Sequence, residues 1–122
     1  ADVRALLSGE TPTEAEHRDA IEVVLPEMRA WYDAVYDRAD LFAWPTLPVV
    51  PPRRHELDEM EVDGELRPTF PTVAAFTSPA SLAGVPSLSV PLQVGPEPVG
   101  LMLEAPAGAD GALLGLADAA RG

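Results

Sequence analysis

Few side chains in this sequence could act as nucleophiles or bases. It holds two histidines, His17 and His55, several serines, no cysteine and no lysine, since all eight basic residues are arginine. Without cysteine there is no thiolate nucleophile, disulfide, iron–sulfur cluster or cysteine-bound zinc. Without lysine there is no Schiff base, P-loop or Ser–Lys catalytic pair. Any chemistry performed by this chain alone would therefore rest on hydroxyl, imidazole and carboxylate groups.

A Ser–His–Asp triad needs a serine presented beside a histidine, commonly on a G-x-S-x-G turn. No such turn occurs in the sequence. His17 stands among acidic residues on a predicted helix and His55 in a charged loop, and both positions are typical of solvated histidines. We therefore predict no catalytic residue in this chain. The serines considered are Ser78, Ser81, Ser87 and Ser89.

An acidic cluster between residues 56 and 65 could attract a divalent cation. It does not follow the D-x-[DN]-x-[DN]-G spacing of a calcium loop, and it is more typical of a solvated charged segment. We expect no metal and no cofactor. The net charge of −12 disfavours nucleic acid as a partner, because phosphate binding depends on clustered basic residues. The cluster consists of Glu56, Asp58, Glu59, Glu61, Asp63 and Glu65.

Length and composition indicate one small domain or a piece of a larger one. The chain has 122 residues and 47% hydrophobic residues, as in globular proteins, and 14 prolines, which is an excess. Its apolar runs are far shorter than the ~20 residues that span a bilayer, so we expect no membrane partner. No signal peptide is visible, and we expect a cytoplasmic protein.

Residues 1–39 are predicted to be helical. A short turn over Asp2–Leu7 should precede a helix over Pro12–Arg38, with Thr11 as N-cap and Glu14 closing a capping box. Apolar residues then recur every three or four positions along this helix. Pro26 falls inside the pattern and should kink or split the helix.

Short strands, turns and a last helix follow. Residues 40–52 read as a strand over 40–44 and a proline-rich loop, and 53–71 as a charged excursion or small hairpin with a turn at Asp63-Gly64. Residues 72–122 begin with a small-residue helix, Thr72–Gly84, interrupted at Pro79. A hairpin over 87–103 comes next, its second strand, 99–103, buried on both faces. A final helix then extends to Ala120, capped by Asp110.

Three motifs, taken in order, resemble the C-terminal part of amidase signature enzymes. Asp40–Pro48, DLFAWPTLP, is similar to that family's D-x-x-x-x-P-T-x-P element. Ser81–Gly100 carries SLAGVPSLSVPL and a closing PVG, similar to N-x-x-G-x-P-x-x-S-x-P and P-V-G. Gly108–Leu114, GADGALL, is similar to the closing G-x-D-x-x-L-L helix. Ser81 stands where the family usually has asparagine. The order and spacing of the three motifs agree with the family over nearly the whole chain.

This resemblance implies an α/β fold: the C-terminal segment of a mixed-sheet α/β/α amidase, with a long N-terminal helix, short strands, a hairpin and a C-terminal helix. It also implies hydrolysis of carboxamide C–N bonds by a Ser–cis-Ser–Lys triad. With no lysine, the chain lacks that triad. The implied partners are the remaining N-terminal portion of the amidase, on the same or a separate polypeptide, and a small amide substrate. This chain alone should be inactive, and it could form a homo-oligomer through its strand edges.

The resemblance also suggests which residues line the acyl part of the substrate pocket. They are Ala74, Phe76 and Ser78, with Thr46 at the pocket rim; tight packing against a neighbouring helix is the competing interpretation of the small residues. The Val-Asp-Gly and Ala-Gly-Val-Pro runs are similar to those of aryl-acetamide hydrolases. The alternative function is a non-catalytic, acidic, proline-rich interaction module derived from an amidase C-terminus.

Overall fold

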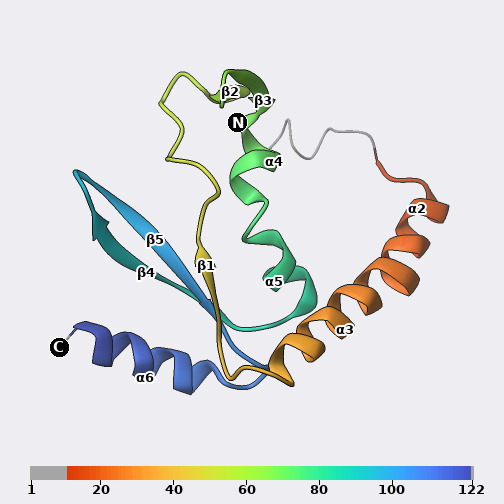
Figure 1. Cartoon of the computed structure of the whole chain (residues 1–122). Coiled ribbons are helices and arrows are strands. Elements are labelled where there is room, and N and C mark those ends of the chain that lie inside the picture. Colours follow the sequence, from red (N-terminus) through yellow and green to blue (C-terminus); the bar gives the residue numbers. More distant parts are fainter. Residues whose placement is uncertain (1–10, 122) are drawn as a thin grey trace.

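The computed structural model describes residues 11–121, which form a long helical arm, a three-stranded sheet, a small hairpin and further helices (Figure 1). The predicted turn over Asp2–Leu7 lies outside the described residues. The elements are α2 (Glu14–Asp19), η1 (Ala20–Val24), α3 (Leu25–Tyr36), β1 (Phe42–Pro45), β2 (Glu59–Val62), β3 (Glu65–Pro68), α4 (Thr69–Ala74), α5 (Ser78–Ala83), β4 (Ser87–Val94), β5 (Glu97–Glu104) and α6 (Asp110–Arg121).

The helical arm begins two residues later than predicted. Thr13, not Thr11, is the N-cap: its hydroxyl accepts from the Glu16 N–H at 3.3 Å, and the Glu16 carboxylate accepts from the Thr13 N–H at 2.8 Å. The sequence contains the Thr-x-x-Glu pattern twice in overlapping registers. The register that forms also pairs Glu14 with Arg18, four residues later, at 2.7 Å.

Pro26 neither breaks nor sharply bends this arm, which runs on as one rod through α2, η1 and α3 (Figure 1). A π-helical segment, η1, precedes it, and the Leu25 N–H donates to the carbonyl of Ala20, five residues back. Proline has no N–H, and its ring clashes with the carbonyl four residues earlier. The wider π turn relieves that conflict, so the prediction of a split helix was wrong.

The main sheet has the order β1-β5-β4 and is antiparallel throughout. Because side chains alternate along each strand, its two faces differ. One face packs against α6 through a core of Leu103, Ala105 and Leu113. The other face carries Phe42, Trp44, Met102 and Glu104 and turns toward α3 and α5. Partly buried residues around the first core are Leu41, Leu88, Val90, Leu101 and Ala109.

The predicted strands shift slightly in the structure. β1 covers residues 42–45 and not 40–44, and β5 is buried only at its end, where Met102 is 3% and Leu103 7% exposed. Val99 is 43% exposed, so the expectation that this strand is buried on both faces fails for its first half. That half lies in the projecting part of the β4–β5 hairpin (Figure 1).

Glycine, aspartate and proline residues explain where several of the helices and strands begin or end. The small hairpin β2–β3 is closed by Asp63 and Gly64, both with positive φ (53° and 82°), as two-residue hairpins require. Gly84 ends α5 with φ 78°. Pro79 lies in the first turn of α5, directly after its first residue Ser78, where it was predicted to interrupt a helix. Asp110 is the first residue of α6 and not its cap.

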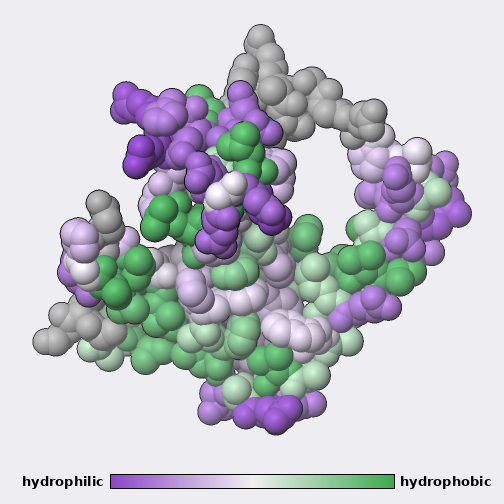
Figure 2. Space-filling model, turned by 45° about the horizontal axis from the view of Figure 1, so that its top comes forward, coloured by the Kyte–Doolittle hydropathy of each residue, from purple (hydrophilic) through white to green (hydrophobic). Residues whose placement is uncertain are grey.

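Many large apolar side chains stay at the surface of the described residues (Figure 2). Figure 2 shows green, apolar surface between purple, hydrophilic zones. No helix within residues 11–121 combines the length and apolar character needed to cross a bilayer. The more exposed examples include Val50, Leu57, Leu66, Phe70, Leu82, Val94 and Leu114.

Replacing Leu113 by alanine tests the packing of α6 on the sheet. Leu113 is 4% exposed, so Leu113→Ala should lower the free energy of unfolding by about 2–5 kcal/mol through lost burial and a cavity. Leu114→Ala is the matched control because Leu114 is 60% exposed, and its cost should stay below about 0.5 kcal/mol. Urea unfolding followed by circular dichroism measures both. Equal losses would contradict the orientation of α6.

Candidate functional site

The segment that follows β1 meets the β4–β5 hairpin at Gly100. The Thr46 N–H donates to the Gly100 carbonyl at 2.8 Å, and the hydroxyls of Thr46 and Ser89 hydrogen-bond at 2.6 Å. A Cβ atom on residue 100 would lie 2.5 Å from Thr46 Oγ1 and 2.8 Å from Ser89 Oγ. Only glycine leaves room for this hydroxyl pair. Gly100 is therefore the position in β5 that permits this close approach.

The predicted pocket residues are partly brought together around Trp44. Phe76, in the connection between α4 and α5, stacks on the Trp44 ring with centroids 5.2 Å apart and planes at 6°. Thr46 follows Trp44 by two residues. Ala74, half-buried, ends α4, and Ser78, exposed, begins α5. Trp44 is thus the residue that links Phe76 to the segment bearing Thr46.

The stack belongs to a longer aromatic cluster that joins α3 to β1. From Trp44 it continues to Phe42 at 5.0 Å, to Trp31 at 5.6 Å and to Tyr32 at 5.0 Å between ring centroids. Tyr36 then stacks on Tyr32 at 6.1 Å. The mixed edge-on and stacked geometries are the favourable ones for aromatic pairs. These aromatic side chains therefore pack α3 against β1.

Glu104 was missed by the sequence predictions. It ends β5 directly opposite Phe42, and its side chain is 0% exposed. The available signal was an acidic residue closing the apolar run Val99–Leu103, but only the fold shows that it is buried. Buried polar atoms without a hydrogen bond gather here: Tyr32 Oη, Tyr36 Oη, Trp44 Nε1 and both Glu104 carboxyl oxygens.

The Glu104 carboxyl has an altered acidity with a clear cause. Burial raises its pKa, and the Tyr32 hydroxyl and Trp44 N–H, which lie near enough to favour the carboxylate, oppose part of that rise. Burial and the neighbouring Glu104 raise the pKa of Tyr32 above its usual range and that of Tyr36 to about 12. This carboxyl therefore keeps its proton to a higher pH than a solvated one.

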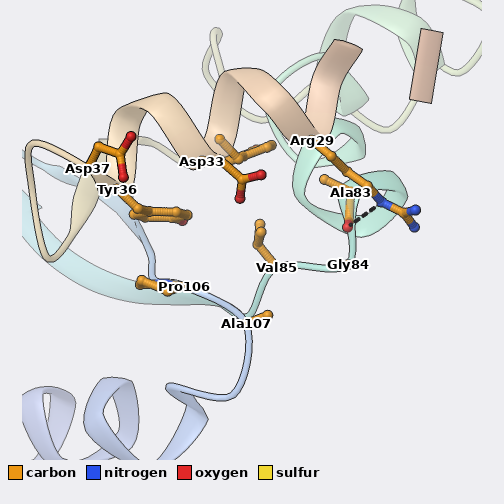
Figure 3. Close-up of a pocket in the computed structure, with 10 residues that line it drawn as sticks. Arg29, Asp33, Tyr36, Asp37, Ala83, Gly84, Val85, Pro106 and Ala107 are labelled. Carbon is orange, nitrogen blue, oxygen red and sulfur yellow. Dashed lines mark hydrogen bonds between the residues drawn. The ribbon is translucent and has the colours of Figure 1, made fainter. Parts of the chain in front are cut away.

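A shallow groove of about 510 Å³ lies beside this cluster, between α3, the end of α5 and the segment after β5 (Figure 3). Arg29 crosses its edge, where Nε donates to the Ala83 carbonyl at 3.3 Å, and Asp33 and Asp37 place carboxylates on its rim. No serine, threonine or histidine lines it. None of the four predicted pocket residues does either.

The remaining sequence candidates lie in solvent. His17 and His55 are exposed, and so is most of the acidic cluster of residues 56–65. Ser81, which replaces the usual asparagine, donates its hydroxyl to the carbonyl of Thr77, the N-cap residue of α5, at 3.3 Å. Over residues 11–121 no group of histidine and acidic side chains is arranged to hold a metal ion.

Comparison with known proteins gives consistent results. The model of the Amidase family matches residues 4–114. The chain is 36% identical over 110 residues to one component of the glutamyl-tRNA(Gln) amidotransferase of Haloarcula marismortui, covering 85% of this chain and 24% of that protein. It is 30% identical over 118 residues to indoleacetamide hydrolase of Allorhizobium ampelinum, covering 93% of this chain and 26% of the relative.

Solved structures agree with these relatives. A crystal structure of an amidase superimposes with a TM-score of 0.70 at 30% identity, covering 93% of this chain and 26% of that one. A chain from a vestigial protein complex, connected with the origins of an s-triazine catabolic enzyme, gives 0.78 at 24% identity, with 94% and 25% covered. This chain thus has the fold of an amidase segment and spans about a quarter of the curated relatives it matches.

Gly100→Ala tests the junction of Thr46 and Ser89. The added methyl group must displace both hydroxyls, so the free energy of unfolding should fall by about 1–3 kcal/mol, as for overpacked sites. Gly115→Ala is the control: nothing lies within 4 Å of its added Cβ, and alanine in mid-helix should stabilise by about 0.5–1 kcal/mol. Chemical unfolding compares them, and a neutral Gly100→Ala would refute the crowding.

The raised pKa of Glu104 predicts a pH dependence of stability. The folded state holds this proton more tightly than the unfolded state, so its contribution to stability is fully present below the unfolded carboxyl pKa and is lost as pH rises through the folded pKa. Glu104→Gln should remove this part of the decline, whereas Glu61→Gln, at an exposed position, should not. Urea midpoints across acid to neutral pH test this; identical pH profiles in both variants would contradict it.

Proposed function

Because this chain belongs to the amidase family, we propose that it is the C-terminal part of an amide hydrolase whose catalytic triad lies outside these 122 residues. The observation that carries the proposal is the junction at Gly100. Thr46 comes from one family-like motif and Ser89 and Gly100 from another, and they meet within hydrogen-bond distance. Residues of two motifs that lie far apart in the sequence thus form one contact in the sheet.

The proposed reaction follows the chemistry of serine amidohydrolases. A serine of the missing part attacks the amide carbonyl while a lysine, acting through a bridging serine, takes its proton; the nitrogen leaves protonated, and water hydrolyses the acyl-enzyme. This chain has no lysine, so the base must be supplied from elsewhere. Its own contribution is structural: a sheet, its covering helices and one wall of the acyl pocket.

Exposed apolar side chains support the idea that these residues pack on further protein. Leu82 on α5 is 61% exposed, and Ile21 and Val24 on the helical arm are 52% and 47% exposed. β4 is an edge strand of the main sheet, and Val94 near its tip is 60% exposed. Surfaces of this kind are typical of contacts with a partner or a second segment.

We further propose that the acyl pocket is lined by Phe76 and Ala74, with Ser78 and Thr46 at its edge. The Phe76 ring, backed by Trp44, offers a flat aromatic wall. That wall fits an aryl-acyl amide, in line with the similarity to an indoleacetamide hydrolase. An acidic interaction module without catalytic relevance is the competing function, favoured by the net charge of −12.

A chimera tests the proposed function. Residues 11–121 replace the matching C-terminal quarter of the Allorhizobium ampelinum indoleacetamide hydrolase, which keeps its own remaining part. We expect the chimera to hydrolyse indoleacetamide and the 122-residue chain alone to release no ammonia above background. The truncated hydrolase without any replacement is the control. A chimera as inactive as that control, or turnover by the chain alone, would contradict the proposal.

A further inference from the structure

The β4–β5 hairpin presents one apolar face, and α6 covers only half of it. Side chains alternate along a strand, so every second residue of β4 lies on the face against which α6 packs. Leu88 and Val90 are half-buried beside the α6 core, whereas Leu92 is 40% and Val94 60% exposed. Val99, opposite Leu92 on β5, is 43% exposed. These three exposed side chains form the far half of the apolar face, called the hairpin face below.

The dimensions of the hairpin explain why α6 leaves the hairpin face open. Strands rise about 3.4 Å per residue, so the stretch from Leu88 to Val94 is about 20 Å long. A helix with its side chains is about 10 Å wide. α6 runs at an angle to the hairpin and separates from it toward the tip (Figure 1). The uncovered half of the apolar face therefore has the width of one further helix.

The composition of the hairpin indicates that the hairpin face is covered in the complete protein. β4 is an edge strand of the described sheet, and edge strands that face water commonly carry charged residues. The β2–β3 hairpin of this chain follows that rule with Glu59, Glu61, Glu65 and Arg67. Neither residues 87–94 nor residues 98–103 contain a charged residue. An uncharged apolar face of this kind is typical of a contact with further protein.

Pro91 indicates that the occupant packs on the face of the hairpin and not along its edge. The Gly100 carbonyl accepts from the Thr46 N–H, so the backbone groups of Gly100 point toward β1. Pro91 lies opposite Gly100, and its own backbone groups therefore point away from β5, to the open edge of the sheet. Proline has no N–H to offer a further strand there. The edge is thus protected against strand addition, whereas the apolar face beside it is not.

We propose that the hairpin face is the docking surface for a helix of the remaining N-terminal portion of the amidase, which packs beside α6 on the same side of the sheet. This inference rests on the proposed function, because that portion supplies the helix. The chain spans 24% and 26% of two amidase relatives, so the greater part of such a protein is available to cover the face. The helix should present apolar residues three and four positions apart.

The net charge of this chain argues against a second copy as the occupant. At −12, two copies repel each other, and the hairpin face offers no charged group that could offset the repulsion through Leu92, Val94 or Val99. A helix from a different segment carries no such penalty, because its charges are independent of those of this chain.

Cysteine labelling tests whether the hairpin face is covered. The chain has no cysteine, so Val94→Cys on the hairpin face and Glu61→Cys on the charged hairpin each introduce one reporter. Both variants are made in the 122-residue chain and in the chimera described above, and alkylation of the reporter is followed by mass spectrometry. Val94→Cys should react roughly tenfold more slowly in the chimera than in the chain alone, because a covered thiol is shielded. Glu61→Cys should differ by less than about twofold.

Cross-linking identifies the occupant. A short bifunctional reagent joins the Val94→Cys thiol of the chimera to its nearest neighbours, and peptide mapping locates them. We expect neighbours in the portion that the hydrolase contributes, three or four residues apart, as on one side of a helix. Neighbours two residues apart would indicate a strand, and links between two chimera molecules would indicate a second copy. Either of these results overturns the proposal.

The outcomes separate this inference from the function on which it rests. If the chimera hydrolyses indoleacetamide but Val94→Cys reacts as fast in it as in the chain alone, the docking surface is wrong and the proposed function stands. If the chimera is inactive while Val94→Cys is protected and cross-linked to a helix, the docking surface is supported and the catalytic proposal fails. An inactive chimera with an unprotected reporter contradicts both.

Discussion

The absence of a side chain at Gly100 is the constraint on which the rest of this structure depends. It lets the hydroxyls of Thr46 and Ser89 meet at 2.6 Å and the Thr46 N–H bond the Gly100 carbonyl, so the chain leaving β1 is tied to β5 and β4 at once. A shift of one residue in any strand would move a side chain into this contact and turn the leucine face away from α6. The register of the sheet and the site of α6 docking therefore follow from one close approach.

The same register buries the carboxyl of Glu104, and burial of an acidic group lowers the stability of the fold. With Phe42 opposite Glu104, the acidic side chain lies beneath α3, among aromatic residues and away from water. Its acceptor oxygens lie near the donors of Tyr32 and Trp44, and Trp44 stacks on Phe76. A polar group inside an aromatic cluster thus connects the long helical arm, the sheet and the proposed pocket wall. The groove beside it carries the carboxylates of Asp33 and Asp37.

The features that could be predicted from the sequence are those that depend on residues close together in the chain. The Asp63-Gly64 turn, the 87–103 hairpin and the final helix all depend on residues near each other in the chain. The helix start was misplaced because two overlapping capping patterns compete, and the effect of Pro26 was misjudged because a π turn absorbs it. Glu104 could not be found from sequence, since its burial depends on α3 and β1, which are distant along the chain. Phe76 was named, but its stacking on Trp44 is a tertiary contact that no spacing predicts.

If residues 11–121 complete an amidase, they must bind the part that carries the triad. The most direct measurement titrates the separate 122-residue chain into the truncated Allorhizobium ampelinum indoleacetamide hydrolase that lacks the matching quarter, and follows ammonia release from indoleacetamide together with the mass of the complex. We predict that activity rises and saturates at an equimolar ratio, as a complex of both polypeptides forms. Association without activity, or no association at all, would contradict this account.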